Sequence, residues 1–439
     1  MRVDFTWLTV VAVGLAACAQ PGGPGSKDAA VSVGVDLAGR DLYGVDLYGW
    51  DKSDLATSLT PDLAKPRFGI AATGTWMQVA SPADSLSGAK NSTWPDLALY
   101  QGRPAMAWVE SGQVRVATWN SGWSVLGNAL GGTTAAYGTQ LDGTNDQLHV
   151  GFFELPSVGA AHNAIYVYHW SGTTYDAVGA AVDQGLTYLP DLSLVVDSGG
   201  KPIIAWTAQV GGSSGHSEIV AQRFDGASWM PYGIGLHAES ATSSALSAHL
   251  AIDTGDHVFA SWQETFVHVY RSSLSTFAPV GLNSGKIVYS GSSTSSYETR
   301  LCVDSQGRPV VGWMEYSGGS AGIYVDRWSG TDWTSQVSPA LSAQPGSTNS
   351  QIAAITTDGV DAPVVVWQEP DASSVSRLYV ARIASGVGTL LGQPLALPSG
   401  YQNISFATVV VDGNDVPMVA FAAQKTSDST YQLFVYRYL

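Results

Sequence analysis

Short segments in which apolar residues alternate with polar ones, or stand almost unbroken, recur along the whole second part of this chain. The clearest copies read Pro-x-Val-x-Trp-x-Glu, as at residues 309–315 and 363–369. An aromatic residue anchors each copy, and successive anchors are 44, 54, 56, 51, 54 and 54 residues apart: Trp108, Phe152, Trp206, Trp262, Trp313, Trp367 and Phe421. Repeats of this length that hold several short strands indicate a small sheet repeated around an axis.

Each repeat divides into four predicted strands. The first is apolar and ends in Asp, as in residues 190–197 and 405–412, and a Gly-containing turn follows it. The second carries the anchor aromatic, and the third is a β-branched and aromatic segment such as 323–328. The fourth opens with an aromatic residue: Trp123, Tyr175, Trp229, Phe277 and Trp333. Near-continuous apolar strands of this kind suit sheets that are covered on both faces.

Seven copies of the first three strands can be counted, but the seventh copy ends at Leu439 without a fourth strand. Residues 73–79 contain Gly74-Thr-Trp76, which is similar to the Gly-x-x-Trp opening of fourth strands elsewhere. We therefore predict an all-β fold, a seven-bladed β-propeller of four-stranded antiparallel blades over residues 69–439, in which strand 73–79 completes the last blade. This closure would remove exposed sheet edges, whereas an open array would need polar capping repeats at both ends.

Composition narrows the classes of partner. The chain has 439 residues, of which only 13% are charged, and a formal net charge of −16. Nucleic-acid binding requires a basic surface, so we expect no nucleic acid as a partner. No segment shows sustained helical periodicity with caps, which agrees with an all-β fold.

The N-terminus has the features of a processing signal. Residues 1–17 hold an apolar run that is too short for a permanent membrane span. The run ends in Leu15-Ala-Ala-Cys18, which resembles the lipobox of bacterial lipoproteins. The resemblance implies cleavage of a signal peptide at 1–17 and lipidation of Cys18, and Ala19 implies an outer-membrane lipoprotein that faces the periplasm or the cell surface. The alternative is an ordinary secretory peptide with an incidental cysteine.

Residues 18–68 form a predicted flexible tether. They begin at the cysteine, contain Pro21-Gly-Gly-Pro-Gly25 and then repeat Asp-Leu pairs with few large apolar residues. Such a segment cannot bury enough surface to offset its ordering entropy. Cys302 is the one other cysteine, so a lipidated chain would have no intramolecular disulfide.

The second strands supply the candidate ligand-binding residues. An aromatic and a Glu two positions later share one face of a strand. We predict that they line polar pockets around the channel mouth or between blades: Glu110, Glu154, Glu264, Glu315, Glu369, Trp108, Trp262, Trp313 and Trp367. The alternative, which repetition itself favours, is a structural role in which each Glu accepts hydrogen bonds from backbone amides or from an Arg.

Two further repeated residue types have structural interpretations. An Asp closes most first strands, and we expect its carboxylate to bond turn amides: Asp142, Asp197, Asp253, Asp304, Asp358 and Asp412. We predict no cofactor; calcium would need further oxygen ligands at alternate positions, to which 142–146 and 412–415 come closest. An Arg recurs on the third strands, and we expect it to pair with the Glu set: Arg223, Arg271, Arg327, Arg382 and Arg437.

The chain carries no His-Glu-x-x-His and no paired-cysteine metal motif. The repeat Asp-x-x-Gly-x-Pro-x-Val-x-Trp-x-Glu resembles units of uncharacterised bacterial lipoprotein propellers over residues 73–439. It is more distantly similar to kelch, sialidase-like and fucose-lectin propellers. We hypothesise a membrane-anchored propeller that binds a glycan or a protein through one face. The alternatives are a sialidase-like exo-glycosidase and a scaffold of an envelope complex.

Overall fold

The computed structural model describes residues 69–439 except 72, 82–90, 133, 156–162, 183–186, 189–190, 211–214, 241–242, 274–275, 282–284, 288–295, 318–319, 344–349 and 396. The predicted signal peptide, Cys18 and the tether at 18–68 lie outside these described residues. No helix within the described part of the chain has the length and apolar content needed to cross a membrane.

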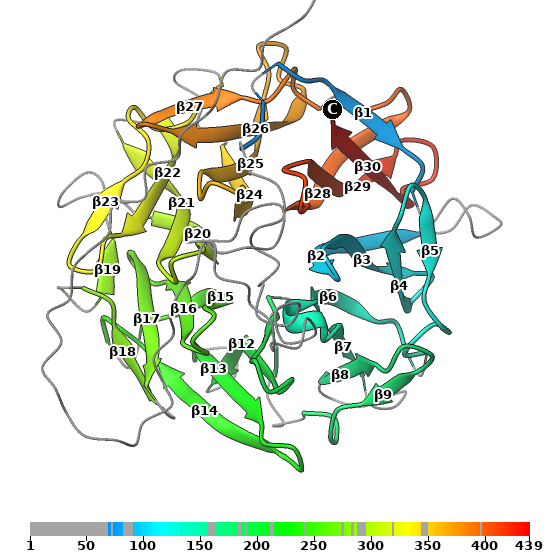
Figure 1. Ribbon diagram of the computed structural model, residues 1–439, viewed down its shortest axis with the longest axis vertical. Coiled ribbons are helices and arrows are strands. Elements are labelled where there is room, and N and C mark those ends of the chain that lie inside the picture. The colour runs from blue at the N-terminus through cyan, green and yellow to red at the C-terminus, as the bar shows by residue number, and fades with distance from the viewer. Residues whose placement is uncertain are drawn as a thin grey trace, which may run out of the picture. The chain divides into compact units, whose positions relative to one another are not determined.

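The described residues form seven antiparallel sheets arranged around an axis, as Figure 1 shows. The prediction of a seven-bladed β-propeller is confirmed. The strands of blades 1 to 3 are β2 (Ser92–Tyr100), β3 (Arg103–Glu110), β4 (Gln113–Trp119) and β5 (Trp123–Val125); β6 (Tyr137–Asp142), β7 (His149–Glu154), β8 (Ala164–Trp170) and β9 (Tyr175–Ala177); and β10 (Thr187–Tyr188), β11 (Ser193–Val196), β12 (Pro202–Val210), β13 (His216–Phe224) and β14 (Trp229–Leu236). A short 3-10 helix, η3 (Thr144–Asp146), follows β6.

Blades 4 to 7 repeat the same order from the axis outward. Their strands are β15 (Leu246–Ile252), β16 (Val258–Gln263), β17 (Val267–Ser273), β18 (Thr276–Pro279) and β19 (Lys286–Ile287); β20 (Ser296–Val303), β21 (Pro309–Ser317), β22 (Ser320–Trp328) and β23 (Trp333–Ser335); β24 (Gln351–Thr357), β25 (Pro363–Pro370), β26 (Ser376–Ala384) and β27 (Val387–Leu390); and β28 (Tyr401–Val411), β29 (Pro417–Lys425), β30 (Tyr431–Tyr438) and β1 (Trp76–Val79).

Strand β1 closes the ring, as the sequence predicts. It pairs antiparallel with β30, in a register that sets Trp76 opposite Tyr438 and Val79 opposite Val435. The Trp76 indole also donates to the Leu391 carbonyl oxygen at 2.6 Å, in the neighbouring blade 6. The first strand of the domain is thus the outer strand of the last blade, and both ends of the domain are fastened at one seam.

The core consists of seven apolar layers, one between each pair of adjacent blades. The layer between blades 5 and 6, for example, contains Val310, Ile323 and Trp367. The layer between blades 7 and 1 contains Trp108 and Ala420. Side chains on both faces of every sheet are therefore removed from water. This arrangement explains the near-continuous apolar strands, because no blade has a face left for solvent.

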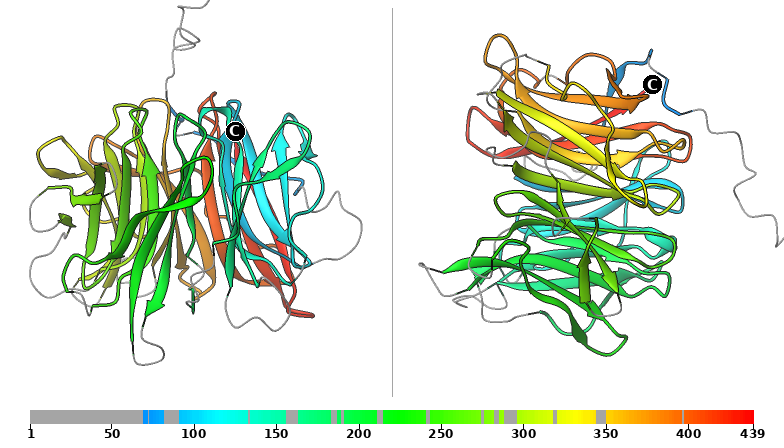
Figure 2. Two further views of the ribbon diagram at one scale, coloured as in Figure 1. Left: turned by 90° about the horizontal axis from the view of Figure 1, so that it is seen from below. Right: turned by 90° about the vertical axis from the view of Figure 1, so that its left-hand side faces the viewer.

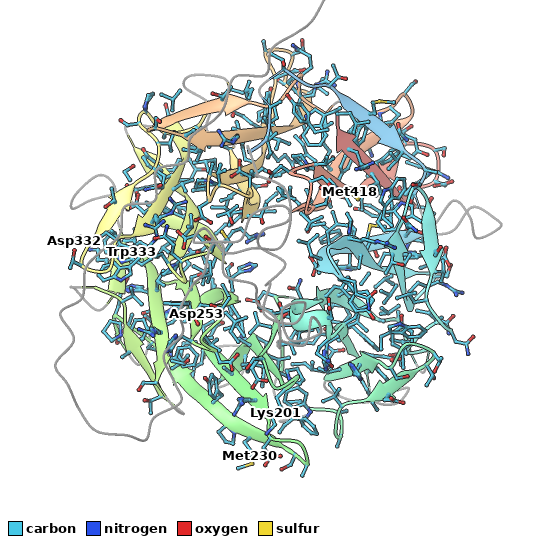
Figure 3. All side chains as sticks on the ribbon, viewed as in Figure 1. Lys201, Met230, Asp253, Asp332, Trp333 and Met418 are labelled. Carbon is cyan, nitrogen blue, oxygen red and sulfur yellow. The ribbon has the colours of Figure 1, made fainter. Side chains whose placement is uncertain are left out.

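The strands run between two opposite faces of the ring, which Figure 2 shows edge-on. We call the face where the second strands end the Glu face, after Glu110, Glu264 and Glu369. The opposite face, where the first strands end in turns, is the Asp face. Side chains at the outer rim and near the axis are seen in Figure 3, where Trp333 and Asp332 lie at the rim and Asp253 lies nearer the axis.

On the Asp face, each strand-closing Asp holds its own turn. The Oδ1 atom of Asp358 accepts backbone N–H groups of Val360 and Ala362 at 3.1 and 2.9 Å. The same pattern recurs at four other positions: Asp197, Asp253, Asp304 and Asp412. Asp142 accepts the N–H group two residues on, that of Thr144. The expected turn role of these residues is confirmed.

The expected pairing of third-strand Arg residues with the Glu set is wrong. Four of the five Arg side chains bind the strand-closing Asp instead: Arg223 to Asp197, Arg327 to Asp304, Arg382 to Asp358 and Arg437 to Asp412. The antiparallel register is the physical reason. Each Arg lies opposite the start of the second strand, as Arg382 lies opposite Val364, and the Glu stands at that strand's other end.

Candidate functional site

The predicted Trp residues and Glu residues are buried inside the blades. Trp108, Trp262 and Trp313 are 0% exposed and Trp367 is 1% exposed. The carboxylates are also buried, with exposures of 7% or less: Glu110, Glu154, Glu264, Glu315 and Glu369. The structure therefore does not bring this set together as one exposed ring of polar groups.

Most of these carboxylates bind the segments that connect one blade to the next. Glu264 accepts the backbone N–H groups of Ala238 and Glu239 at 2.5 and 3.1 Å, and the Trp262 indole at 2.9 Å. Equivalent bonds link Glu154 to Gly132 and Thr134, and Glu369 to Ser342, Ala343 and Trp367. Glu315 accepts the Trp313 indole at 3.1 Å, and Glu110 pairs with Arg115 at 3.0 Å. These contacts are those of the structural interpretation.

Two cavities lie along the propeller axis. The cavity on the Asp face measures about 770 Å³ and the cavity on the Glu face about 370 Å³. Six aliphatic side chains line both, and so form a belt between them: Leu97, Leu141, Leu194, Leu301, Ile355 and Val409. The residue that precedes each belt position lines the Glu-face cavity, and most of these residues are polar. The Glu-face cavity is therefore the more polar of the two.

One residue from each first strand forms a ring around the Glu-face cavity. Each member pairs with the residue just before an anchor aromatic, as Asp96 pairs with Ala107. The seven members, which we call the variable ring, are Asp96, Gln140, Ser193, His249, Arg300, Ala354 and Thr408. All seven line the cavity. The next residue along each strand is aliphatic in every blade, whereas the ring position differs in every blade.

A β-bulge precedes the variable ring in six blades, where the register shifts between the start of the first strand and the ring member. Two residues before the ring member, the backbone has a positive φ in five blades: Trp94 (52°), Gly138 (61°), Ser247 (58°), Glu298 (44°) and Phe406 (57°). Non-glycine residues in this region cost about 1–3 kcal/mol each and occur most often at functional sites. Bulges also redirect side chains next to such sites.

An aromatic wall stands on one side of the Glu-face cavity. The rings of Trp94 and Phe406 lie with centroids 3.7 Å apart at 30°, and Tyr137 lies 6.3 Å from Trp94. Phe406 remains 36% exposed. Blades 7 and 1 thus present flat apolar surface beside the polar ring.

Two carboxylates in the cavity wall connect neighbouring blades. Asp96 accepts the Leu141 N–H at 2.7 Å and the Thr408 hydroxyl at 3.2 Å, so it links blades 7, 1 and 2. Asp191 accepts the Ser247 N–H at 2.9 Å and also binds Thr207. Burial raises the pKa of Asp96 to about 7 and that of Asp191 to about 6, because both carboxylates lose water contact.

The opposite wall of the cavity, in blades 4 and 5, carries His249 and Arg300, and the charge of Arg300 also acts on Glu298. Burial lowers the pKa of His249 well below its usual value, and the nearby charge of Arg300 adds to this. Arg300 donates to the carbonyl oxygens of Ala353 and Thr299 at 2.6 and 2.8 Å. Burial raises the pKa of Glu298, while the Arg300 charge opposes this. No other described residue donates to or accepts from the His249 ring, so this neutral imidazole offers both a donor and an acceptor to a ligand.

Sequence reasoning missed the variable ring because it searched for what recurs. The useful signal was the opposite: a position with a different chemical type in each repeat, directly before a residue that is always aliphatic. Such a position does not have to hold one residue type in order to build a blade. Its alignment still required the strand register, because Asp96 and Asp191 both occur in Pro-Asp-Leu triplets yet only Asp96 belongs to the ring.

No protein-family profile matches this chain, and no curated protein matches its sequence. Among solved structures, the chain is similar to the polysaccharide lyase Uly1, with a TM-score of 0.48 and 8% identity over 85% of this chain and 99% of that one. It is similar to an alpha-L-arabinanase of Penicillium chrysogenum (TM-score 0.43, 12% identity, 83% and 97% covered) and to a sialidase of Trypanosoma rangeli (0.43, 11%, 79% and 55%).

These TM-scores are all below 0.5 and the identities are 12% or less, so the likeness is one of fold. The expected kinship with propellers is confirmed as a type of fold. Kinship with lipoprotein propellers in particular stays a prediction.

Proposed function

We propose that the propeller binds a glycan in the Glu-face cavity. The variable ring is the observation that carries the proposal: seven equivalent positions hold Asp, Gln, Ser, His, Arg, Ala and Thr. Equivalent backbone positions that carry different polar side chains suit a ligand whose hydrogen-bond donors and acceptors point in several directions. Sugar hydroxyls have this property.

The aromatic wall supports the same ligand class. Trp94 and Phe406 offer flat apolar area, against which the C–H face of a sugar ring can pack. The cavity of about 370 Å³ lies near the lower end of the range of about 300–1,000 Å³ for small-molecule sites. We therefore expect recognition of a terminal part of a glycan.

A glycan array probed with the purified full chain tests this proposal. Sugars that bind are then titrated against Trp94→Ala and Arg300→Gln, for which we expect binding to be lost or strongly weakened. Trp333→Phe is the matched control, because Trp333 lies at the outer rim and donates to the Val280 carbonyl oxygen. The absence of any bound glycan, or undiminished binding by a folded Trp94→Ala protein, would overturn the proposal.

Hydrolysis of a glycosidic bond is a second candidate, favoured by one observation. Two carboxyl groups with raised pKa values, Asp96 and Asp191, line one cavity. Glycosidases use a carboxyl group with a raised pKa as general acid and a second carboxylate as base or nucleophile. Turnover of fluorogenic exo-glycoside substrates that disappears in Asp96→Asn or Asp191→Asn would support catalysis. No turnover across the panel by wild-type protein would reject it.

We also propose that Cys18 is lipidated and that the tether holds the propeller at the outer membrane. The lipobox-like sequence before Cys18 supports this. Fractionation of cells that express wild-type chain and Cys18→Ser tests it. Recovery of both proteins in the soluble fraction would contradict anchoring.

A further inference from the structure

Three metal-ligating side chains converge in blade 3, away from the axis. His216 is the first residue of β13, and Glu218 follows two residues later on the same face of that strand. His237 directly follows β14, which pairs with β13 next to it. The two strands lie side by side in Figure 1. Their pairing sets Ile219 opposite Leu236, so the start of β13 lies beside the end of β14 and the three side chains are close together.

The distances fit a shared ion. The Nε2 atom of His216 lies 3.0 Å from Oε1 of Glu218, and the Nε2 atom of His237 lies 3.7 Å from the same oxygen. One ligand atom from each of the three residues can be chosen so that all lie within 4.8 Å of one another. Tetrahedral zinc with bonds of about 2.0–2.2 Å holds its ligand atoms about 3.3–3.5 Å apart. The two distances bracket this value.

His237 provides a second, independent observation that points to a ligand. Its side chain is 8% exposed, and both ring nitrogens are buried without a hydrogen-bond partner among the described residues. The 3.7 Å separation from Glu218 is too long for a hydrogen bond. Leaving a buried polar group unsatisfied costs about 1–3 kcal/mol, and such a group calls for an explanation. A metal ion would supply the partner.

Blade 3 departs from the repeat at this place. Ala208 occupies the position of the second-strand Glu, and it lies directly opposite Glu218 in the sheet. The carboxylate at this end of the blade therefore comes from the third strand instead of the second. Glu264 of the next blade accepts a hydrogen bond of 2.5 Å from the backbone N–H of Ala238, the residue after His237. This bond holds the backbone next to His237.

We propose that His216, Glu218 and His237 bind a divalent transition metal ion of the zinc type. Two imidazoles and one carboxylate suit zinc, cobalt or nickel, whereas calcium and magnesium require mainly oxygen ligands. Three protein ligands leave a coordination position for water. The site lies in blade 3 outside the Glu-face cavity lining and does not depend on the proposed glycan binding.

Metal titration of the full chain, purified without a histidine tag and stripped with a chelator, tests the proposal. We expect one equivalent of Zn²⁺ by calorimetry, and one equivalent of Co²⁺ with the visible absorption of a low-symmetry cobalt site. Zn²⁺ should also raise the melting temperature. Loss of an outer-sphere partner typically weakens metal binding about 10–100-fold, so removal of a ligand should weaken it by at least about 100-fold.

The variants that remove a ligand are His237→Asn, Glu218→Gln and His216→Asn. The His216 side chain is 25% exposed, so His216→Asn should leave folding intact. The matched control is His257→Asn, because His257 pairs with a single carboxylate, Asp253, at 2.8 Å and should not contribute to the site. Failure of wild-type protein to take up one equivalent of either metal would overturn the proposal. So would unchanged affinity in folded His216→Asn and Glu218→Gln proteins.

Discussion

The carboxylate of Asp96 accepts a hydrogen bond of 2.7 Å from the backbone N–H of Leu141 in the neighbouring blade. First strands of adjacent blades do not share a sheet, so side chains must make such links. Ser193 makes the equivalent bond to the Leu250 N–H at 2.9 Å, and Arg300 donates to the Ala353 carbonyl oxygen at 2.6 Å. The variable ring therefore joins blades and also lines the cavity.

The raised pKa of Asp96 should appear in the pH dependence of stability. Its pKa is about 7 in the folded chain, against about 3.9 in an unfolded one. The folded state binds the proton more tightly, so the contribution of Asp96 to the free energy of unfolding is fully present below about pH 4 and is lost as pH rises through about 7. Urea unfolding from pH 4 to 8 should show this decline in wild-type protein relative to Asp96→Asn. Parallel curves for the two proteins would contradict it.

Strain at Phe406 should reverse the usual order of two small substitutions. Ala normally stabilises a chain over Gly by about 0.4–1 kcal/mol, but a left-handed backbone costs non-glycine residues about 1–2 kcal/mol. Since φ at Phe406 is 57°, Phe406→Gly should be more stable than Phe406→Ala by about 1 kcal/mol. The control is the exposed strand residue Val387, where Ala should be the more stable. Urea unfolding of the four variants measures both differences.

The Asp–Arg pairs of the Asp face should contribute to stability. Arg382 lies 2.5 Å from Asp358, whose side chain is fully buried. Arg382→Gln leaves that buried carboxylate short of a partner, so we expect a loss of about 1–3 kcal/mol in the free energy of unfolding. Arg377→Gln disrupts a pair in which both side chains are more than 20% exposed, and it should cost less than about 1 kcal/mol. Equal effects of the two substitutions would refute this account.

Closure of the ring should depend on Trp76. Its ring packs 5.1 Å from that of Tyr438 and its indole bonds the Leu391 carbonyl oxygen. Trp76→Ala removes both contacts, and for a partly buried aromatic we expect a loss of about 2 kcal/mol. Met77, the next residue on β1, is 53% exposed, and Met77→Ala should stay within about 0.5 kcal/mol of wild type. Denaturant unfolding of both variants checks the contrast.

Glu369 allows a test of the role of the second-strand carboxylates. Glu369→Ala leaves the Ala343 N–H and the Trp367 indole without their acceptor inside the blade. We expect a loss of about 2–4 kcal/mol in stability, because these two N–H donors become unsatisfied and the Ser342 hydroxyl also loses its acceptor. Affinity for any glycan found on the array should not change at temperatures where the variant is folded. Weakened glycan binding by folded Glu369→Ala would restore the Glu set as ligand-binding residues.

The propeller could be predicted because its construction depends on short-range pattern. An aromatic at the middle of each second strand, such as Trp313, has to fill the layer between two blades in every repeat, so it recurs at a regular interval. The missing fourth strand and the Gly-Thr-Trp sequence at residues 74–76 likewise indicated that this strand completes the last blade, where the structure sets Trp76 opposite Tyr438. These features need no knowledge of distant contacts.

The predicted pairing of the third-strand Arg residues with the Glu set was wrong because it did not take the strand register into account. Spacing along the chain shows that Arg382 and Glu369 both recur, but only the pairing of Val364 with Arg382 shows that they stand at opposite ends of the blade. An explicit antiparallel alignment of the second and third strands would have identified Asp358 as the partner. Residue types alone do not show at which end of a blade a side chain lies.

Sequence alone determined the repeat, the number of blades and the strand that closes them, because each blade is built by contacts within and between regularly spaced segments. Tertiary structure decided which residues face the axis and which converge outside it. Asp96, His249 and Arg300 line one cavity and each follows a bulge in its own first strand. His216 and His237 approach only where β14 pairs beside β13. Such meetings join single positions from different repeats or strands, and a periodic pattern carries no record of them.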